Sequence, residues 1–286
     1  MDTVTETFDA LTRLVGAGDV VVLSGAGLST ESGIPDYRGP SGAARRHTPM
    51  TYQAFTRDPH ARRRYWARSH LGWRMIARAA PNDGHRAVAR LQRAGLLGGI
   101  ITQNVDGLHT AAGATGVIEL HGRLDEVTCL DCGNLTSRDE LHRRLTEANP
   151  GFDARVAHVN PDGDVELPDE AVSRFRTVDC GICGAGMLKP DVVFFGETVP
   201  APRVADCFAH VERARALLVL GSSLTVMSGR RFVLRAAKLG IPVAIVNQGP
   251  TRGDGYASLT LDAPLGATLT ALADRVAAGP VPAAAV

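Results

Sequence analysis

The segment that most constrains the fold is residues 20–38, in which an apolar run leads into a glycine-rich loop. Four apolar residues in succession, Val20–Leu23, three of them β-branched, are typical of a parallel strand that is covered on both faces. Gly25 and Gly27 follow, and glycine permits a positive φ and a close approach of the backbone to a ligand. Backbone N–H groups exposed in such a loop can bind a phosphate. The segment therefore predicts a strand and loop that bind a nucleotide.

The loop departs from two common phosphate-binding motifs. Thr30 stands where the fingerprint of ordinary dehydrogenases has its third glycine, and Ala44–Arg46 occupy the region where that fingerprint has an acidic residue for the ribose. The Lys-Ser/Thr pair of a P-loop does not follow the loop. These observations exclude a hydride-transferring dehydrogenase and a P-loop enzyme. A simple tight strand–helix turn stays open as an alternative interpretation of Gly25–Gly27.

Further apolar runs without polar alternation occur along the chain, separated by segments with helical patterns. Continuous apolar strands that alternate with helices indicate a parallel sheet buried between two helical layers. The sequence therefore predicts an α/β fold, a Rossmann-like parallel sheet with helices on both faces. Besides residues 20–23, the expected strands are 99–102, 117–120, 192–195, 216–220 and 243–246, and the expected helices are 4–17, 51–79, 82–95, 203–215 and 229–239.

Four of the five cysteines form two Cys-x-x-Cys pairs, Cys129 with Cys132 and Cys180 with Cys183. In an intracellular chain two such pairs predict a four-cysteine zinc site rather than disulfides. The segment between the pairs, 133–179, is longer than a compact zinc ribbon needs, so it is expected to form an excursion of its own. Redox chemistry at the two pairs is the alternative interpretation. Cys207 is expected to be buried and unreactive.

We expect one catalytic region that covers residues 1–280 and combines a large Rossmann-like domain with two insertions. The first insertion is helical, and the second carries the cysteines and forms a small zinc-binding domain. The end of the chain consists of small residues and prolines, which predicts a disordered tail. The expected large domain is 1–38, 81–124 and 188–278, the helical insert 39–80, the small domain 125–187 and the tail 279–286.

The formal net charge of the chain is +1, so charge alone attracts it to neither nucleic acid nor a membrane surface. The first 15 residues include three acids, unlike a signal peptide, and no apolar run approaches the roughly 20 residues that span a bilayer. We therefore expect a soluble, cytoplasmic protein. The basic run Arg62–Arg64 beside Tyr65 and Trp66 could bind nucleic acid, but a helix that packs its aromatic side chains is favoured.

Polar or glycine-rich residues follow directly after five predicted strands. In an open parallel sheet, ligands bind beyond the carboxyl ends of the strands. The coincidence indicates a large polar cofactor that lies across this edge of the sheet. The residues concerned are Gly25–Arg38, Gln103–His109, His121–Gly122, Gly221–Ser223 and Asn247–Gly249.

His121 and Asp106 are the candidate catalytic residues among these strand ends. A histidine, with an unperturbed pKa near 6.5, suits a general base at neutral pH, and the glycine after His121 leaves its ring open to the cleft. A structural histidine is the alternative. Asp106 with Asn104 could hold an amide-bearing ring, and either residue also suits a helix N-cap. His109 is assigned to helix packing.

Together these motifs resemble those of the sirtuins, the NAD-dependent protein deacylases. The motifs occur in the order found in that family, and the resemblance covers roughly residues 5–275. Two segments, Arg64–Trp73 and Asn247–Asp254, are most similar to the class II branch, which contains the mitochondrial sirtuin 4 and bacterial relatives. The motifs are Gly25–Arg38, Thr102–His109, Glu119–Gly122, the two cysteine pairs and Val192–Glu197.

The resemblance implies that the chain binds NAD. The loop after the first strand would hold the pyrophosphate and the nicotinamide ribose, and Tyr37 corresponds to the aromatic residue that shields the reactive ribose carbon. Gln103, Asn104 and Asp106 would hold the nicotinamide and its ribose. The implied NAD contacts are Gly25, Ala26, Gly27, Ser29, Thr30, Ile34, Pro35, Asp36, Tyr37, Arg38, Gln103, Asn104, Val105, Asp106, Gly221, Ser222, Ser223, Asn247, Gln248, Gly249 and Leu265.

The implied reaction moves an acyl group from a protein lysine to NAD and releases nicotinamide, deacylated lysine and 2′-O-acyl-ADP-ribose. His121 would act as the general base on the ribose hydroxyls. An acylated lysine-containing protein would pair as a strand with Val193–Glu197, through Val193, Phe195, Gly196 and Glu197. Four thiolates leave a zinc ion no open position, so the implied Zn²⁺, bound by Cys129, Cys132, Cys180 and Cys183, is structural.

The acyl group is a separate question. Tyr65 and Arg68 have the Tyr-x-x-Arg spacing by which the desuccinylase branch of the sirtuins binds acidic acyl groups, and at i and i+3 they would share a helix face. The favoured alternative is that Tyr65 packs in the core and Arg68 is solvated. Two other functions stay open for the whole chain: a protein mono-ADP-ribosyltransferase, and a module that binds NAD or acylated proteins without catalysis. Position 222 is Ser where many relatives have Thr.

Overall fold

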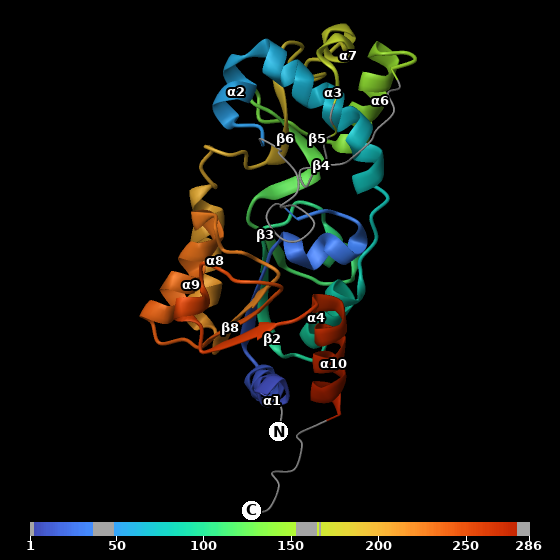
Figure 1. The fold of residues 1–286 in the computed structure, drawn as a ribbon. Coiled ribbons are helices and arrows are strands. Elements are labelled where there is room, and N and C mark those ends of the chain that lie inside the picture. Colours follow the sequence, from blue (N-terminus) through green and yellow to red (C-terminus); the bar gives the residue numbers. More distant parts are fainter. Residues whose placement is uncertain (1–2, 37–48, 153–164, 166, 279–286) are drawn as a thin grey trace, which may run out of the picture.

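The computed structural model describes residues 3–36, 49–152, 165 and 167–278, and the structural statements below concern those residues. They form two sheets (Figure 1), a large parallel sheet and a small antiparallel sheet at the top of the view. The predicted tail, 279–286, lies outside the described residues.

The large sheet has the strand order β3-β2-β1-β7-β8-β9, and each pair of neighbours is parallel. The strand order reverses between β1 and β7, and such a switch point is where α/β sheets bind their ligands. The predicted α/β fold is confirmed, and β9 is an addition to it. The strands are β1 (Val20–Ser24), β2 (Leu97–Thr102), β3 (Val117–Glu119), β7 (Ala216–Leu220), β8 (Val243–Asn247) and β9 (Leu259–Asp262).

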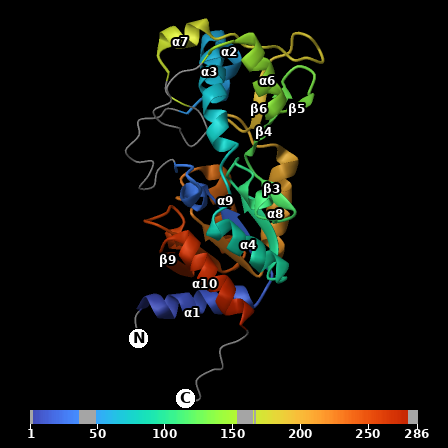
Figure 2. The same ribbon diagram turned by 90° about the vertical axis from the view of Figure 1, so that its right-hand side faces the viewer.

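Two hydrophobic cores, one on each face of the sheet, explain why β1 has no polar alternation. Val20 and Val22 pack into a core with α1, α4 and α10, whereas Val21 and Leu23 pack into a second core with α8 and α9. Figure 1 shows α8 and α9 on one side of the sheet and α4 and α10 on the other, and Figure 2 shows α4 beside α10. The helices are α1 (Thr3–Gly16), α4 (Asp83–Arg93), α8 (Ala201–Arg213), α9 (Met227–Lys238) and α10 (Leu265–Ala277), with shorter turns η1 (Ala26–Ser32), α5 (Leu108–Ala111) and η2 (Asp254–Tyr256).

The small sheet and the helical insert share one core. Phe55, Tyr65 and Trp66 of the insert pack with Val127 and Leu188 of the sheet. The two insertions, which are far apart in sequence, therefore fold together at the top of Figure 1. The elements are α2 (Tyr52–Arg57), α3 (Pro59–Ile76), β4 (Gly122–Cys129), β5 (Leu135–Ser137), α6 (Arg138–Ala148), α7 (Asp169–Arg174) and β6 (Leu188–Val192), in the sheet order β5-β4-β6.

The strand expected at 192–195 is not part of the large sheet. The chain forms β6 instead, which ends at Val192 and pairs antiparallel with β4 in the small sheet. An apolar run predicts burial but does not say in which sheet the strand lies. β4 was not predicted, because its side chains are alternately buried and partly exposed. This alternation leaves no continuous apolar run of the kind that marks the strands of the large sheet.

The single helix expected at 51–79 is divided at Asp58. Asp58 has an extended backbone with φ −111° and accepts a hydrogen bond from the His60 N–H, so it ends α2 and caps α3. Pro59 explains the break, because a proline disfavours the helical conformation in the preceding residue and suits the first position of a helix.

The aromatic residues of α3 are core residues. Tyr65, Trp66 and Trp73 are all buried, and the Trp66 indole N–H donates to the carbonyl of Leu188. The interpretation that this helix packs its aromatic side chains in the core is therefore confirmed. In the part of the chain that the structure describes, no helix has both the length and the apolar character needed to cross a membrane.

Candidate active site

A cavity of about 890 Å³ lies beyond the carboxyl ends of β1, β2, β7 and β8. Its volume falls within the roughly 300–1,000 Å³ typical of ligand sites. Every residue for which a contact with NAD was predicted lines this cavity, apart from Tyr37 and Arg38, which lie outside the described residues. His121, Val193, Phe195, Gly196 and Glu197 line it as well, so one cavity contains the predicted cofactor, base and peptide residues.

The glycines of the first loop have a different role from the one predicted. Gly25 is extended with φ −137°, and Gly27 is not among the glycines with positive φ. Their N–H groups donate to the carbonyls of Leu220 (2.9 Å) and Gly221 (2.8 Å), so neither is available to a phosphate. A Cβ on Gly25 would lie 2.8 Å from the Ser222 Cβ, and one on Gly27 would lie 2.9 Å from the Gly221 Cα. Glycine is required because the loops after β1 and β7 are in backbone contact.

The loop after β1 is also fixed to α10. Gly221 has φ +61°, and a Cβ there would lie 2.6 Å from both the Leu28 nitrogen and the Leu265 Cδ1. The Glu31 carboxylate accepts a hydrogen bond from the Gly266 N–H at 3.0 Å, at the N-terminus of α10. A carboxylate is favourable there because of the helix dipole. These contacts place Leu265, the last of the predicted NAD residues, at the cavity wall.

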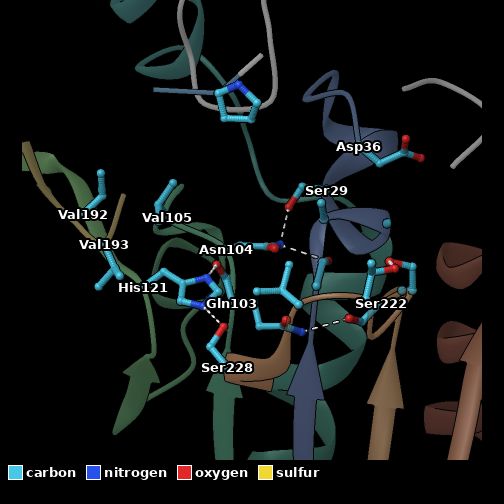
Figure 3. A pocket seen from close by; sticks show the side chains of 18 of the residues that line it. Ser29, Asp36, Gln103, Asn104, Val105, His121, Val192, Val193, Ser222 and Ser228 are labelled. Atoms are coloured by element: carbon cyan, nitrogen blue, oxygen red, sulfur yellow. Dashed lines mark hydrogen bonds between the residues drawn. The ribbon is translucent and has the colours of Figure 1, made fainter. Parts of the chain in front are cut away.

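Asn104, Ser29 and Asp106 form a hydrogen-bonded cluster in the wall, and Figure 3 shows the bond between Asn104 and Ser29. The Asn104 amide donates to the Gly25 carbonyl (3.1 Å) and to the Ser29 oxygen (3.0 Å), and the Ser29 hydroxyl donates to Asp106 (2.7 Å). Asp106 also accepts from the Leu108 N–H. Burial raises the pKa of Asp106, and the hydrogen bonds from Ser29 and Leu108 oppose that shift. Asp106 therefore both closes the turn before α5 and orders the cavity wall.

Gln103 connects the ends of β1, β2 and β7. Its side-chain amide donates to the Ser222 hydroxyl (2.9 Å) and to the Ser24 carbonyl (3.3 Å). Ser222 therefore has its oxygen in the wall and bonded to Gln103. At the far end of the cavity, the Asn247 amide donates to the Gly249 carbonyl at 2.8 Å, which folds the loop after β8.

His121 lies between the large and small sheets, with a hydrogen bond to each ring nitrogen. Its Nδ1 is 2.9 Å from the Gln103 carbonyl oxygen, and its Nε2 is 2.8 Å from the Ser228 hydroxyl oxygen (Figure 3). Burial lowers the pKa of His121, as do the positive charges of Arg203 and Arg231, whereas the Gln103 carbonyl raises it. The ring is therefore held neutral at neutral pH, the form that can accept a proton.

The segment after β6, Val193–Glu197, is not part of a sheet strand: Phe194–Glu197 form a turn, and Phe195 makes a single parallel bridge with Thr51. The Val193 N–H donates to the His121 carbonyl (2.8 Å), and the Phe194 N–H donates to the Glu197 carboxylate (2.8 Å). Glu197 also pairs with the buried Lys189 at 3.1 Å, and the Lys189 ammonium lies 4.9 Å from the centre of the Phe194 ring. An ion pair with one buried partner thus holds the predicted peptide-binding segment against the cavity.

Tyr65 and Arg68 do not meet at the cavity. Tyr65 is buried and lines it, in contact with the rings of Phe55 and Phe194. Arg68 is not among the described residues that line the cavity, and its guanidinium donates to the Val165 carbonyl. Arg68 is thus bonded to the backbone rather than simply solvated.

The four predicted zinc ligands form one cluster. Their sulfur atoms all lie within 4.8 Å of one another, and the Cys129–Cys183 and Cys132–Cys180 sulfurs are 3.8 Å apart. A Zn–S bond of about 2.3 Å in a tetrahedron separates the sulfurs by about 3.8 Å, so the cluster fits zinc. The two Cys-x-x-Cys loops, called knuckles below, have the same geometry. In each, the N–H of the glycine after the second cysteine donates to the carbonyl of the first cysteine.

Several wall residues were not predicted, among them Leu224–Ser228 and Arg231, which lie in the loop before α9 and in its first turns. Ser228 is the most important, because it contacts His121. The sequence does contain a signal, since this segment directly follows the polar end of β7. The predicted site residues after β7 extend only to Ser223, and the chain turns back across the cavity beyond that point.

A doubly wound parallel sheet, a cavity at its switch point with hydroxyl and amide groups in its wall, and a half-buried neutral histidine beside them are typical of an enzyme that acts on a nucleotide-containing molecule. The comparisons name the family. The sequence model of the Sir2 family matches residues 25–228, and the chain belongs to that family.

The relatives cover almost the whole chain. An NAD-dependent protein deacetylase 1 of Streptomyces coelicolor is 65% identical over 260 residues, which are 91% of this chain and 87% of the relative. One of Mycobacterium avium is 50% identical over 271 residues, 93% of this chain and 94% of the relative. A solved structure of a Sir2 enzyme superimposes with a TM-score of 0.76 at 30% identity, over 96% of this chain and 98% of that one. A Sir2 complex with a p53 peptide and NAD⁺ gives 0.71 at 29% identity, over 94% and 96%.

Proposed function

We propose that this protein is an NAD-dependent protein-lysine deacylase. The observation that carries the proposal is the single cavity that brings His121, the Asn104–Ser29–Asp106 cluster and the Val193–Glu197 segment together. Relatives at 65% and 50% identity are named NAD-dependent protein deacetylases, which supports the same activity. The products are nicotinamide, deacylated lysine and 2′-O-acyl-ADP-ribose.

The cavity suits NAD in size and in chemistry. Its hydroxyl and amide groups, from Ser29, Gln103, Asn104 and Ser222, can hydrogen-bond ribose and a carboxamide. When bound, NAD supplies an electrophilic ribose carbon once nicotinamide leaves, and a ribose hydroxyl that receives the acyl group. The Asn104 and Asp106 side chains orient the nicotinamide end of NAD, and Gln103 and Ser222 line the same cavity.

His121 is proposed as the general base. Because the Gln103 carbonyl can only accept, Nδ1 carries the ring hydrogen and the lone pair is on Nε2, beside the cavity. Nε2 accepts the proton of a ribose hydroxyl, so that the oxygen can attack the acyl carbon. The lowered pKa keeps the imidazole in this accepting form.

The acylated peptide is proposed to lie along Val193–Glu197, with backbone hydrogen bonds that select little for sequence. The acyl chain then reaches a wall that includes Tyr65, Leu124 and Phe194. An acidic acyl preference stays a hypothesis, and the Arg68 side chain would have to leave the Val165 carbonyl to provide it. Zinc, held by the four cysteines, stabilises the small sheet and takes no part in the chemistry.

The test is mass spectrometry of lysine peptides that carry acetyl, succinyl, glutaryl, lipoyl or long-chain acyl groups, each with and without NAD. We expect NAD-dependent loss of one acyl mass together with nicotinamide and acyl-ADP-ribose. If no peptide loses its acyl group while an added protein gains the mass of ADP-ribose, the protein is a mono-ADP-ribosyltransferase instead. NAD binding without either product would leave a non-catalytic module.

A further inference from the structure

The Nε2 atom of His121, from which base catalysis would proceed, already has a protein partner. The Ser228 hydroxyl oxygen lies 2.8 Å from it, and both residues line the cavity. Since Nδ1 carries the ring hydrogen, Nε2 is the acceptor and the Ser228 hydroxyl must be the donor. The hydroxyl of Ser228, on α9, therefore already donates a hydrogen bond to the lone pair of the proposed base.

The position of Ser228 is set by a close contact. Ser228 is the second residue of α9, and a Cβ on the next residue, Gly229, would lie 2.3 Å from the Gln103 Oε1. The start of α9 thus packs directly on the Gln103 side chain. The backbone carbonyl of Gln103 in turn accepts the hydrogen bond from Nδ1 of His121. Ser228, His121, Gln103 and Gly229 form a closed ring of contacts, and the imidazole is fixed from both sides.

A hydroxyl can serve both protonation states of the ring. It donates to the neutral Nε2 in the free enzyme, and it can rotate to accept from Nε2–H once the ring has taken a proton. The second hydrogen bond is the stronger, because one partner is charged. Arg203 on α8 and Arg231 on α9 are the charged groups that act on the ring, both unfavourable to an imidazolium, so an acceptor at Nε2 has a large effect there.

We propose that Ser228 is a positioning residue of the reaction: it orients the His121 ring in the free enzyme and then accepts the Nε2–H formed when His121 deprotonates the ribose hydroxyl. In that step the ribose O–H bond breaks, the proton moves to Nε2, and the ribose oxygen keeps the electron pair with which it attacks the acyl carbon. Ser228 rotates about its Cα–Cβ bond from donor to acceptor and is unchanged overall. This role rests on the proposed function, in which His121 is the base.

The test uses Ser228→Ala and Ser228→Thr, with Ser173→Ala as the matched control. Ser173 is an exposed helical serine on α7 that bonds only locally, to the Glu170 carbonyl. Ser228→Ala should lower kcat for deacylation by about 10- to 100-fold, the effect of one hydrogen bond to a charged group. The KM for NAD should change little, and Ser228→Thr should restore most of the rate. Ser173→Ala should behave as the wild type.

The second measurement is the titration of His121 by NMR without NAD or peptide, so it is independent of the reaction. Loss of the stronger, charged-state hydrogen bond should lower the pKa of His121 further in Ser228→Ala and leave it near the wild-type value in Ser228→Thr. An unchanged rate or an unchanged His121 titration in Ser228→Ala would overturn the inference while the wild-type deacylase activity stands. If the wild type deacylates no peptide, the proposed function fails, even where the titration shift is found.

Discussion

At the scale of single residues, the site depends on hydrogen bonds that assign a role to each atom. The Gln103 carbonyl places the ring hydrogen of His121 on Nδ1, and the Asn104–Ser29–Asp106 cluster orders the neighbouring wall. His109, expected to pack a helix, is buried and also bonded to Ser24 at 2.8 Å. Removal of a single side chain should therefore separate binding from chemistry.

His121→Ala should abolish turnover and leave NAD binding measurable, because the ring carries the proton but the wall of Gly25–Asp36 remains. Isothermal titration with NAD, combined with the mass-spectrometric deacylation assay, checks both parts. Activity equal to that of the wild type would contradict the assignment of His121 as the base.

The pH dependence follows from the sign of the His121 shift. The base must be neutral, and its pKa lies below the usual 6.5, so activity should persist at neutral pH and fall only as the pH drops through this lowered value. The acidic limb of kcat/KM, recorded from about pH 5 to about pH 8, should therefore lie below that of an ordinary histidine. A limb above pH 6.5 would contradict the burial argument.

At the scale of elements, the Lys189–Glu197 pair is the contact that shapes the peptide segment. Lys189 is 3% exposed, one of the two lysines of the chain, and burial lowers its pKa. It donates to the Val192 carbonyl and pairs with Glu197, which itself binds the Phe194 N–H. The Lys189 ammonium group thereby joins the turn at Glu197 to the end of β6 at Val192.

Lys189→Met should lower the free energy of unfolding by on the order of 3 kcal/mol, because Glu197 loses its buried partner. It should also raise the KM for the acylated peptide, with a smaller effect on the KM for NAD. Thermal melting and steady-state kinetics measure the two effects. The exposed Lys238→Met provides the control, and an equal rise of both KM values would contradict a role specific to the peptide.

The four-cysteine cluster is the other element-scale contact. It joins the end of β4, at Cys129, to the knuckle that precedes β6. Metal removal by a chelator, or Cys129→Ser, should unfold the small sheet, because the bonds to zinc hold its far end together. Zinc content and far-UV circular dichroism are the measurements. A zinc-free protein with an unchanged spectrum would contradict the structural role, and Cys207→Ser, at a buried cysteine outside the cluster, is the control.

At the scale of the whole molecule, the sequence was sufficient for five of the six strands of the large sheet and for many of the residues around the cavity. Both depend on local signals: unbroken apolar strands and the polar residues that follow them. It was not sufficient for β6, β9 or the shared core of the two insertions, because these depend on pairing between distant segments. The close approach of Gly25 to Gly221 and Ser222 belongs to the same class, and it gives a reason for a glycine at position 25 that the sequence did not reveal. The class II assignment and the acidic-acyl hypothesis stay predictions.

One feature of the small sheet bears on motion. β4 begins directly after His121 and β6 ends directly before Val193, and Gly122 pairs with Val192 at this end, while Cys129 pairs with Leu188 at the other. The base and the peptide segment thus lie at the same end of a two-stranded ribbon, and the four-cysteine cluster lies at its opposite end. Because the Val193 N–H also donates to the His121 carbonyl at 2.8 Å, a rotation of that ribbon against the parallel sheet would carry both segments together. The spacing between the base and the peptide segment would then be kept while their distance from the β7 loop changed.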